Sequence, residues 1–260
     1  MSISKKIMVL VVAYNAEKTI SHLLDRIPKE IWDKSKEIVV ADDCSKDKTS
    51  KVAEEYRKRN NKRNLTVIHH KINKGYGGNQ KWGYTYAAKK RYDIVVMLHG
   101  DAQYSPEEIP RLLKPLEEDK ADMVFGSRIA GNPLKGGMPL YKFIGNKFLT
   151  TVQNIILGKK FTEYHSGFRL YSIKALQKIP LNLCSDDFHF DTEIMIQLLI
   201  AGQRIKELPI HTFYGKEKCY VKVIPYGLNV LKAMMGYILT ITNVRPLEKF
   251  KRLNSKKLNE

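Results

Sequence analysis

Hydrophobic residues along the first half of the chain alternate between short apolar runs and helix-spaced apolar positions. Residues 7–13 form a continuous run rich in β-branched side chains, typical of a strand buried on both faces, and residues 18–27 then carry apolar side chains at helical spacing. The unit recurs, with strands expected at 37–41, 65–70 and 93–99 and helices beginning near residues 47, 79 and 105. Four such alternations predict an α/β fold in which helices flank a mostly parallel sheet.

The pattern becomes irregular after a further strand expected at 122–127. Residues 130–140 carry three Gly and two Pro, which predicts a long loop. Helical periodicity resumes at 141–157 and 191–200, followed by a strand at 204–210. The last 36 residues predict an amphipathic helix with a basic tail, and that helix either packs on the protein's own core or lies on a membrane. Its apolar side would hold Leu228, Leu231, Met235 and Ile238.

The charge of the chain indicates an anionic partner. The 260 residues are 43% hydrophobic, enough for one main globular unit with an appendage, and the net charge is +18. Residues 46–74 hold ten Lys and Arg against three Asp and Glu, and residues 232–260 hold seven against two. Such a surface attracts nucleic acid or an anionic membrane. Because zinc-finger, RNP and helix-turn-helix signatures are absent from the sequence, we expect no specific nucleic-acid binding.

Compartment and membrane topology follow from the cysteines and the apolar segments. Cys44, Cys184 and Cys219 are far apart and form no C-x-x-C pair, so we expect neither a disulfide framework nor a thiolate zinc site. Residues 1–6 lead into the first strand without a cleavable leader, which favours a cytoplasmic location. The uncharged stretch at 233–244 is shorter than the roughly 20 residues of a membrane-spanning helix. We therefore expect peripheral association with the membrane.

Polar residues cluster immediately after the apolar runs, where a parallel sheet binds its ligand. Helix capping explains several of them singly, but it does not explain two adjacent carboxylates together with a His-x-Asp pair. The P-loop and G-x-G-x-x-G motifs are both absent. The glycines at 75–78 either form a turn whose N–H groups accept a phosphate or a turn without a ligand. The residues concerned are Tyr14, Asn15, Glu17, Asp42, Asp43, Ser45, Asn73, Gly75, Gly77, Gly78, His99, Gly100, Asp101 and Gln103.

Three sequence segments occur in a characteristic order: VVAYNAE at 11–17, VADDCSKDKT at 40–49 and LHGDAQYSPEEIP at 98–110. In this order they resemble the family-2 glycosyltransferases that load sugars onto polyprenyl or dolichyl phosphate. Together with GSR at 126–128, SGFRLYS at 166–172, and FDTE followed by GQRIKELPI, the resemblance covers about residues 7–215. It implies a GT-A-type, Rossmann-like domain over residues 1–222, with a nucleotide-binding half at about 1–128 and an acceptor half at about 129–222. Residues 223–260 would form the C-terminal amphipathic helix and basic tail.

The resemblance also implies roles on the donor side. Val12, Ala13, Tyr14 and Glu17 would line the nucleotide pocket, and Asp43, or alternatively Asp42, would bind the base. Independently of the resemblance, Gly75 and Gly77 are candidates to approach a phosphate. Asp101 would hold a divalent metal with support from Gln103. His99 stands where the family has Asp, and Cys44 where it has Gly. Imidazole ligates manganese or zinc, whereas magnesium prefers oxygen ligands. The histidine at position 99 therefore leaves the identity of the metal open between Mg²⁺ and Mn²⁺. Alternatively, His99 bonds the sugar or a phosphate, or is structural.

On the acceptor side, the resemblance points to Arg128 and Arg169 as phosphate holders, with Lys135 nearby. A phosphate acceptor is already dianionic and needs positive side chains, whereas a hydroxyl acceptor needs a base, for which Asp191 is the candidate. Asp191 belongs to an acidic cluster with Asp186, Asp187 and Glu193 that alternatively only favours a helix N-terminus. His165 is either a ligand or sugar contact, or a loop histidine.

The leading hypothesis is a metal-dependent, inverting transfer of a hexose from a UDP- or GDP-sugar to polyprenyl phosphate at the cytoplasmic membrane face. The nearest alternative is transfer to a sugar hydroxyl in a lipid-linked glycan or cell-surface polysaccharide. A nucleotidyltransferase is disfavoured because the sequence has no N-terminal G-x-G-T-R-like loop. A nucleic-acid-binding module would explain the charge but not the Asp43, Asp101 and Arg169 motifs.

Overall fold

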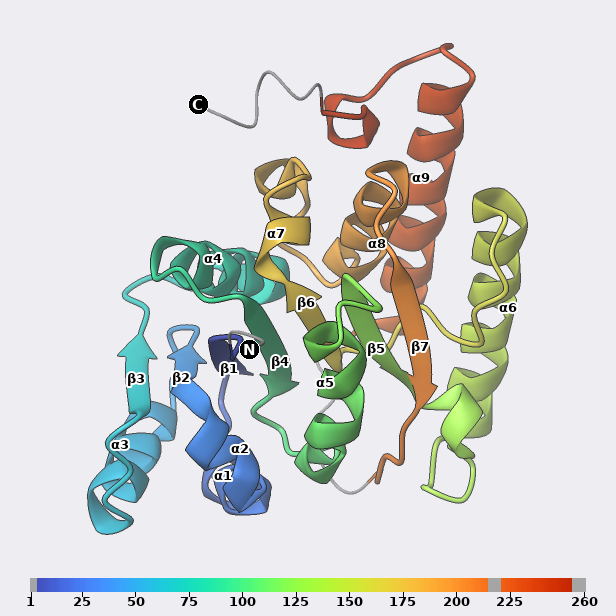
Figure 1. The fold of residues 1–260 in the computed structure, drawn as a ribbon. Coiled ribbons are helices and arrows are strands. Elements are labelled where there is room, and N and C mark those ends of the chain that lie inside the picture. Colours follow the sequence, from blue (N-terminus) through green and yellow to red (C-terminus); the bar gives the residue numbers. More distant parts are fainter. Residues whose placement is uncertain (1–3, 215–220, 254–260) are drawn as a thin grey trace.

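The computed structural model describes residues 4–214 and 221–253. Figure 1 shows a central sheet with helices on both faces and two long helices at one side. The strands are β1 (Ile7–Ala13), β2 (Ser35–Asp42), β3 (Leu65–His69), β4 (Ile94–His99), β5 (Met123–Ser127), β6 (Arg169–Ser172) and β7 (Ile205–Pro209). The α-helices are α1 (Ile20–Arg26), α2 (Lys29–Lys34), α3 (Thr49–Arg59), α4 (Gly75–Lys89), α5 (Ile109–Glu117), α6 (Leu140–Leu157), α7 (Ile173–Leu176), α8 (Phe190–Ile200) and α9 (Val223–Ile241). Short 3₁₀ turns are η1 (Pro106–Glu108), η2 (Ile129–Gly131), η3 (Leu181–Leu183) and η4 (Glu248–Phe250).

The seven strands form one sheet in the order β3-β2-β1-β4-β6-β5-β7. β1 pairs in parallel with β2 and β4, β2 with β3, and β5 with β7, while β6 is antiparallel to both of its neighbours. Six strands therefore run one way, and their carboxyl ends share one edge of the sheet. The prediction of an α/β fold with a mostly parallel sheet is confirmed.

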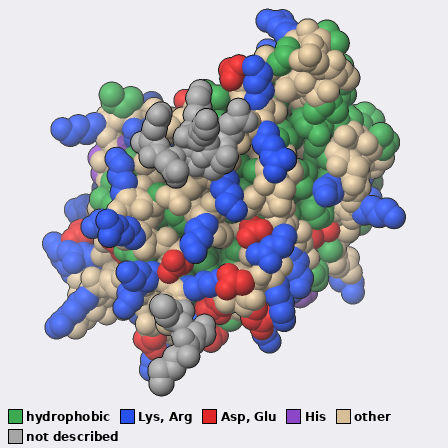
Figure 2. Space-filling view, turned by 45° about the horizontal axis from the view of Figure 1, so that its top comes forward, with side chains coloured by type: hydrophobic (Ala, Val, Ile, Leu, Met, Phe, Trp, Pro, Cys, Tyr) green, Lys and Arg blue, Asp and Glu red, His purple; other side chains and the backbone are tan. Residues whose placement is uncertain are grey.

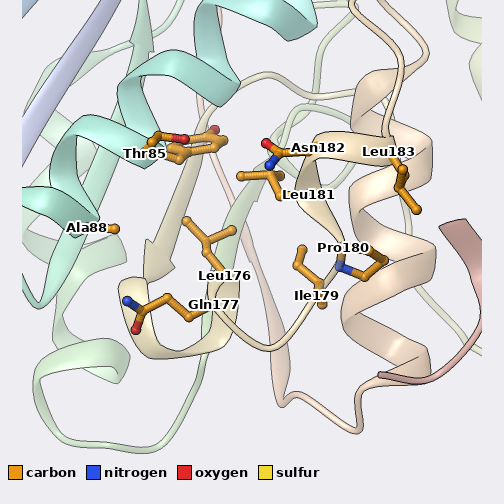
Figure 3. A pocket seen from close by; sticks show the side chains of 10 residues that line it. Thr85, Ala88, Leu176, Gln177, Ile179, Pro180, Leu181, Asn182 and Leu183 are labelled. Atoms are coloured by element: carbon orange, nitrogen blue, oxygen red, sulfur yellow. The ribbon is translucent and has the colours of Figure 1, made fainter. Parts of the chain in front are cut away.

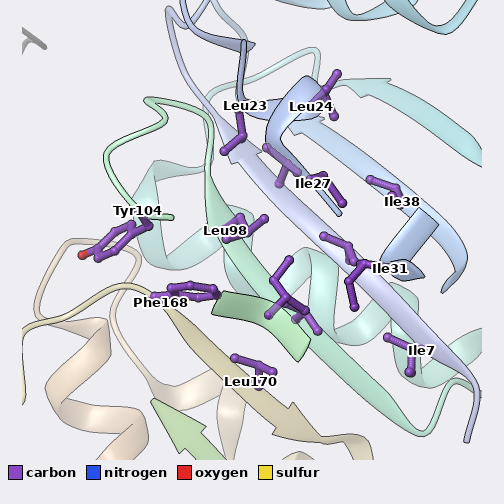
Figure 4. Packing of buried hydrophobic residues seen from close by; sticks show 14 of the residues in the cluster. Ile7, Leu23, Leu24, Ile27, Ile31, Ile38, Leu98, Tyr104, Phe168 and Leu170 are labelled. Carbon is purple, nitrogen blue, oxygen red and sulfur yellow. The ribbon is translucent and has the colours of Figure 1, made fainter. Parts of the chain in front are cut away.

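Apolar side chains pack on both faces of this sheet because its central strands are buried along their whole length. On one face, residues of α1, α2, α3 and α5 pack against Ile7, Ile38, Leu98 and Leu170 (Figure 4). On the other face, residues of α4, α7 and α8 pack against the alternate strand positions, including Met8 and Leu10. This double packing fixes the strand ends that carry the polar residues.

Three elements and one helix start differ from the sequence expectations. β6 was not predicted, because its four residues lie inside a motif whose apolar run is too short to stand out. The short helices α2 and α7 were likewise missed. α4 begins at Gly75 and not near Asn79, so residues Gly75–Gly78 form a helical turn where a loop was expected. Tertiary contacts of those glycines, described below, outweigh their poor helix propensity.

The C-terminal helix α9 lies beside α6 and α8 (Figure 1). Met234 of α9 and Phe250 after it are buried against Ile196 of α8. After α9 the chain turns back, and Lys249 Nζ lies 2.6 Å from the buried carboxylate of Glu193. The predicted C-terminal amphipathic helix is present, while the last seven residues of the basic tail, and Cys219, lie outside the described residues.

Candidate active site

The loops after β1, β2 and β4 are joined by hydrogen bonds at the carboxyl edge of the sheet. The Asp43 N–H donates to Ala13 O over 2.9 Å, and the Gly100 N–H donates to Val12 O over 2.8 Å. β1 lies between β2 and β4, so these bonds bring the two carboxylate-bearing loops to either side of one strand end. The predicted residues Val12, Ala13, Asp43 and Asp101 thus belong to one contiguous corner.

The predicted nucleotide-pocket loop after β1 is tied to the loop after β2. Asn15 N–H donates to Ser45 Oγ over 2.8 Å, and Glu17 Oε2 accepts from Lys48 N–H over 2.8 Å. Asn15 takes a positive φ of 50°, which its short polar side chain tolerates. Tyr14 remains 37% exposed beside this junction. The two loops therefore form one rigid wall of the corner.

The adjacent carboxylates Asp42 and Asp43 differ in their surroundings. The buried Asp42 carboxylate accepts hydrogen bonds from Ser45, Ser50 and His69. Burial alone would raise the pKa of Asp42, but these hydrogen bonds outweigh it and hold the pKa below its usual value. The Asp43 carboxylate accepts the Lys74 N–H over 2.7 Å, and burial raises its pKa. The Asp42 carboxylate thus holds the loop after β2 in place, and Asp43 is the better placed of the two carboxylates to bind a ligand.

The glycine-rich segment differs from the phosphate cradle expected from the sequence. The Gly77 N–H donates to Asp186 O over 2.7 Å, and the Gly75 N–H donates to Asn73 Oδ1 over 3.0 Å. A Cβ at Gly77 would lie 2.3 Å from Ser185 O, so only glycine lets α4 approach this backbone. Both amide groups already have acceptors inside the chain. These glycines dock α4 against the loop before α8.

A hydrogen-bonded chain links the end of β4 to the start of α8. Tyr76 Oη lies 3.1 Å from His99 Nε2 and 2.8 Å from Asp191 Oδ2. Burial lowers the pKa of His99, which keeps its imidazole neutral. Burial and the Asp191 carboxylate together raise the pKa of Tyr76 well above its usual value, which keeps the phenol protonated. The structure thereby brings together three polar groups from three separate elements.

The predicted metal ligands sit beside this chain of hydrogen bonds. Asp101 and Gln103 follow His99 in the same loop, and Asp101 Oδ1 accepts the Gln103 N–H over 3.0 Å. No group of three or more His, Cys, Asp or Glu side chains with the geometry of a metal site exists among residues 4–214 and 221–253. Any cation here would take its remaining ligands from elsewhere, as Mg²⁺ does when it is held by one or two carboxylates and substrate phosphates.

Arg169 lies at the centre of the protein and not on a surface open to phosphate. Its side chain is fully buried, and its three nitrogens donate to Ser166 O, Asp191 O and Tyr164 O over 2.7 to 2.9 Å. Burial opposes the charge, but the Asp191 carboxylate outweighs it and raises the pKa of Arg169. A phosphate would have to displace these carbonyls. The geometry therefore differs from the phosphate-holding role suggested by the sequence and indicates a positioning role.

Arg128 also pairs with a buried carboxylate, but it lies nearer the surface. Its Nε donates to Glu163 Oε1 over 2.8 Å, and its Nη1 donates to Tyr214 Oη over 3.1 Å. Glu163 is fully buried and also accepts the Asn146 amide of α6 over 2.6 Å. Burial would raise the pKa of Glu163, but Arg128 outweighs it and the pKa is lowered. This pair fastens the end of β5 to α6 and leaves 13% of the Arg128 side chain exposed.

Helix α9 reaches the same region through His165. The His165 Nδ1 lies 2.7 Å from Tyr226 Oη, and its Nε2 is buried without a hydrogen-bond partner. Asp191 Oδ1 is likewise buried without one, although it lies 3.7 Å from Arg169 Nε. A buried polar atom without a hydrogen-bond partner costs about 1–3 kcal/mol of folding free energy. These two atoms have hydrogen-bonding capacity that the chain itself does not use, and Arg169 connects the segments that carry them.

The rest of the acidic cluster does not join this site. Asp186 pairs with Lys81 over 2.7 Å, and Glu193 is engaged by Lys249 and by the Ser185 N–H. Asp187 is exposed. Only Asp191 of the four acidic residues faces the hydrogen-bonded chain.

A separate pocket of about 360 Å³ lies between α4 and the 176–183 segment (Figure 3). Its walls include Thr85, Leu176, Gln177 and Leu181, and none of the candidate site residues. The candidate site residues lie elsewhere: Tyr76 is at the opposite end of α4, and Asp191 is at the start of α8. The polar groups predicted from the sequence converge at the edge of the sheet and not in this pocket.

Solved structures with the same architecture define the class of fold. Glucosyl-3-phosphoglycerate synthase from Mycobacterium tuberculosis, crystallised with Mn²⁺, UDP and glucosyl-3-phosphoglycerate, superposes with a TM-score of 0.65 at 18% identity. The match covers 89% of this chain and 79% of that one. The fold is therefore the GT-A arrangement of a mixed, mostly parallel sheet between helices, as predicted.

Sequence comparison then identifies the family. The family model "Glycosyl transferase family 2" matches residues 8–180, so the chain belongs to that family and is a glycosyltransferase. A relative from Methanococcus voltae, named UDP-N-acetylglucosamine–dolichyl-phosphate N-acetylglucosaminyltransferase, is 32% identical over 81% of this chain and 86% of its own length. An undecaprenyl-phosphate mannosyltransferase from Micrococcus luteus is 26% identical over 82% of this chain and 85% of its own.

Three residues of the site were missed by sequence reasoning: Tyr76, Glu163 and Tyr226. Tyr76 stands inside the glycine-rich segment, and Glu163 lies three residues before the first residue of the S-G-F-R motif. Both residues lie next to sequence motifs, and that position beside a motif is the signal that could have identified them. Nothing in the sequence marks Tyr226, which lies in a helix expected to be amphipathic.

Proposed function

We propose that this chain transfers a hexose from a UDP- or GDP-sugar to a polyprenyl or dolichyl phosphate at the cytoplasmic face of a membrane. The reaction is metal-dependent and inverting. The nucleotide-binding half is residues 1–128 and the acceptor half is residues 129–222, although the strands of both belong to one sheet. The sugar-phosphate lipids named among the relatives support the acceptor class.

The donor nucleotide occupies the corner formed by β1, β2 and β4. Val12, Ala13, Tyr14 and Glu17 line the pocket, and Asp43 accepts hydrogen bonds from the base. Asp42, with its carboxylate already saturated, holds the Asp43 loop in place. Gly75 and Gly77 place the start of α4 beside this corner.

A divalent cation, Mg²⁺ or Mn²⁺, fits the residues at the end of β4. Asp101, supported by Gln103, and the neutral imidazole of His99 would hold it together with diphosphate oxygens. Bound there, it stabilises the charge that builds on the leaving diphosphate. Those two side chains alone are too few for a closed site, which agrees with a cation that arrives with its nucleotide.

The acceptor phosphate lies near Arg128, whose side chain is 13% exposed while Glu163 fixes the direction of its guanidinium. Arg169 acts indirectly by holding the Asp191 backbone and the 164–166 loop. A phosphomonoester is already mostly dianionic near neutral pH, so it attacks without a base. Positioning and charge stabilisation then supply most of the catalysis.

Helices α6 and α9 offer an apolar surface for a membrane (Figure 2). Leu228 of α9 is 62% exposed and Phe148 of α6 is 61% exposed, and the two helices pack side by side. Further exposed apolar residues are Leu140, Tyr141, Ile144, Ile155, Ile224, Met235 and Ile241. Exposed lysines lie among them, Lys147, Lys222 and Lys232, and would attract anionic headgroups.

The flanks of α9 support association along the membrane and not across it. Its length and mean hydropathy of 1.2 are those of a candidate spanning helix. However, Tyr226 near its start contacts His165, and Lys249 beyond its end contacts Glu193. At 1.5 Å per residue a spanning α9 would separate those anchors by nearly its whole length on opposite membrane faces. Both anchors instead belong to one globular body.

The observation that carries the proposal is the contact between Tyr226 and His165. It joins the exposed apolar helix to the 164–166 segment, whose carbonyls bind the guanidinium groups of Arg128 and Arg169. A lipid tail on α9 would therefore lie next to the place where its phosphate is needed. A water-soluble acceptor would not need an apolar surface connected to the site.

A thermal-shift panel tests the donor part of the proposal. The purified chain is heated with UDP, GDP and their hexose conjugates, each with Mg²⁺, Mn²⁺ or EDTA. We expect one nucleotide class to raise the Tm in a metal-dependent way, because a ligand of the native state stabilises it. Folded protein that shows no shift with any saturating nucleotide contradicts the proposal.

Transfer to a sugar hydroxyl is the second candidate, and the orphaned Asp191 Oδ1 favours it. A hydroxyl acceptor needs a general base, worth about 10²–10⁴-fold in rate. Asp191→Asn would then abolish transfer and remove the acid limb of the pH–rate profile. With a phosphate acceptor, the same variant keeps that profile.

A further inference from the structure

The hydroxyl of Tyr76 contacts one residue from each side of the candidate site. His99 belongs to the donor side at the end of β4, and Asp191 belongs to the acceptor side at the start of α8. Tyr76 itself comes from a third element, the first turn of α4. Its ring stacks on Phe188 with centroids 4.9 Å apart, which holds the hydroxyl between its two partners.

A phenol hydroxyl has a single hydrogen, so it can donate to only one of these partners. Asp191 Oδ2, at 2.8 Å, is a carboxylate oxygen that only accepts when ionised. The charge-assisted bond is also the stronger of the two. Tyr76 therefore donates to Asp191 and keeps only lone pairs for His99, so the 3.1 Å contact requires a proton on His99 Nε2.

A neutral imidazole with its proton on Nε2 has its lone pair on Nδ1. The ring has little room to change orientation, because a Cβ at Gly167 would lie 2.3 Å from its Cε1 and Tyr104 packs edge-on at 5.2 Å. Within residues 4–214 and 221–253, no hydrogen bond to His99 Nδ1 is formed, and Nδ1 is not one of the enclosed polar atoms. Nδ1 is thus the ring atom that can meet a ligand.

We infer that Tyr76 is a positioning residue that fixes the proton of His99 on Nε2 and so presents the Nδ1 lone pair to the divalent cation of the donor complex. The same hydroxyl holds Asp191 by Oδ2 and so fixes the orientation of that carboxylate. The role of the cation rests on the proposed function, whereas the proton on Nε2 rests on the hydrogen-bond geometry. Outer partners of this kind typically change metal affinity by about 10–100-fold.

The test is ¹⁵N NMR of the full chain labelled at histidine, in which protonated and unprotonated ring nitrogens have well-separated shifts. His99→Gln assigns the His99 signals by their disappearance. Tyr76→Phe deletes the hydroxyl and keeps the ring on Phe188. Tyr104→Phe is the matched control, since its ring also packs on His99 while its hydroxyl accepts the Gly167 N–H.

We expect the wild type and Tyr104→Phe to carry the His99 proton on Nε2 and Tyr76→Phe to lose that preference. Titration with Mg²⁺ and UDP should shift Nδ1 more than Nε2, and Mn²⁺–UDP affinity should fall about tenfold or more in Tyr76→Phe. A proton on Nδ1 in the wild type, or a tautomer unchanged in Tyr76→Phe, overturns the inference without touching the proposed function. If the tautomer is as stated and no nucleotide or metal binds, the cation role and the proposed function fail together.

Discussion

The two sides of the candidate site are held together by different forces. On the donor side, the loops after β1 and β2 are fastened by hydrogen bonds, such as Asn15 to Ser45 and Glu17 to Lys48, and one buried carboxylate, Asp42, accepts several of them. On the acceptor side, buried ion pairs do this work, with Glu163 and Arg128 as the central pair. That side also ends in an exposed apolar helix pair.

This difference suits the two substrates that we propose. A nucleotide is rigid and soluble, and a prebuilt corner of backbone and fixed side chains can receive it. A lipid phosphate brings a charge to the edge of a membrane, where buried guanidinium groups need partners of their own to stay charged and oriented. The acceptor side should therefore be the more sensitive to loss of a single charge, and the following changes test that.

The largest stability effect should come from breaking the acceptor-side ion pair. Glu163→Gln leaves Arg128 largely buried without its carboxylate, and we expect about 3–5 kcal/mol less free energy of unfolding. Urea denaturation measures it. Glu55→Gln in the exposed Lys51–Glu55 pair of α3 is the control, with an expected change below about 1 kcal/mol. Equal losses of unfolding free energy in the two variants would contradict the proposed difference between the acceptor side and the donor side.

On the donor side, the largest effect should be on rate and not on stability. Asp101→Asn keeps the shape of the loop, so the Tm should change little, while kcat/KM should fall by about 10²–10³-fold through lost charge stabilisation. Steady-state kinetics with saturating Mn²⁺ provides the measurement. Activity within a few-fold of the wild type would show that Asp101 holds no catalytic cation.

Membrane binding should depend on the exposed face of α9. Ile224 and Leu228 are 77% and 62% exposed, so the double change to Asp should leave the fold intact. Each side chain contributes about 1.5–3 kcal/mol if it is buried in lipid, so sedimentation with anionic vesicles should weaken at least tenfold. The matched control is Leu183→Asp, since Leu183 is 49% exposed and lies on η3, away from α6 and α9. Equal losses in both variants would contradict the assignment of this face.

The smallest predicted effect is on the pH dependence of stability. Burial lowers the pKa of His165 to about 3, against about 6.5 in the unfolded chain. The unfolded state alone gains a proton as pH falls below 6.5, so the stability present above that pH is lost on acidification. Between pH 7.5 and 5.5 this amounts to about 1.4 kcal/mol.

Urea denaturation at those two pH values measures the loss. His165→Gln should reduce it, whereas His211→Gln should not, because the His211 side chain is 75% exposed. An unchanged pH dependence in His165→Gln would show that His165 is not held neutral by burial.

The donor side could be predicted from the sequence because short local patterns determine where its residues lie. Apolar runs such as residues 7–13 locate the strands, and strand ends locate Asp43 and Asp101. The acceptor side depends on contacts between distant segments, such as Tyr226 with His165, which no local pattern records. The same reason made Arg169 look like a surface phosphate holder, although its side chain is enclosed by carbonyls from two segments. Whether an arginine is buried is decided by packing and not by its motif.

A transfer assay with lipid vesicles tests the central claim most directly. The purified chain is incubated with Mn²⁺ or Mg²⁺, radiolabelled UDP- or GDP-hexoses, and vesicles that contain either polyprenyl phosphate or the corresponding polyprenol. Our account predicts label in the lipid fraction only with polyprenyl phosphate, and its loss with EDTA or Asp101→Asn. Label that reaches a sugar hydroxyl but never the lipid phosphate, from an enzyme that binds the nucleotide, would contradict it.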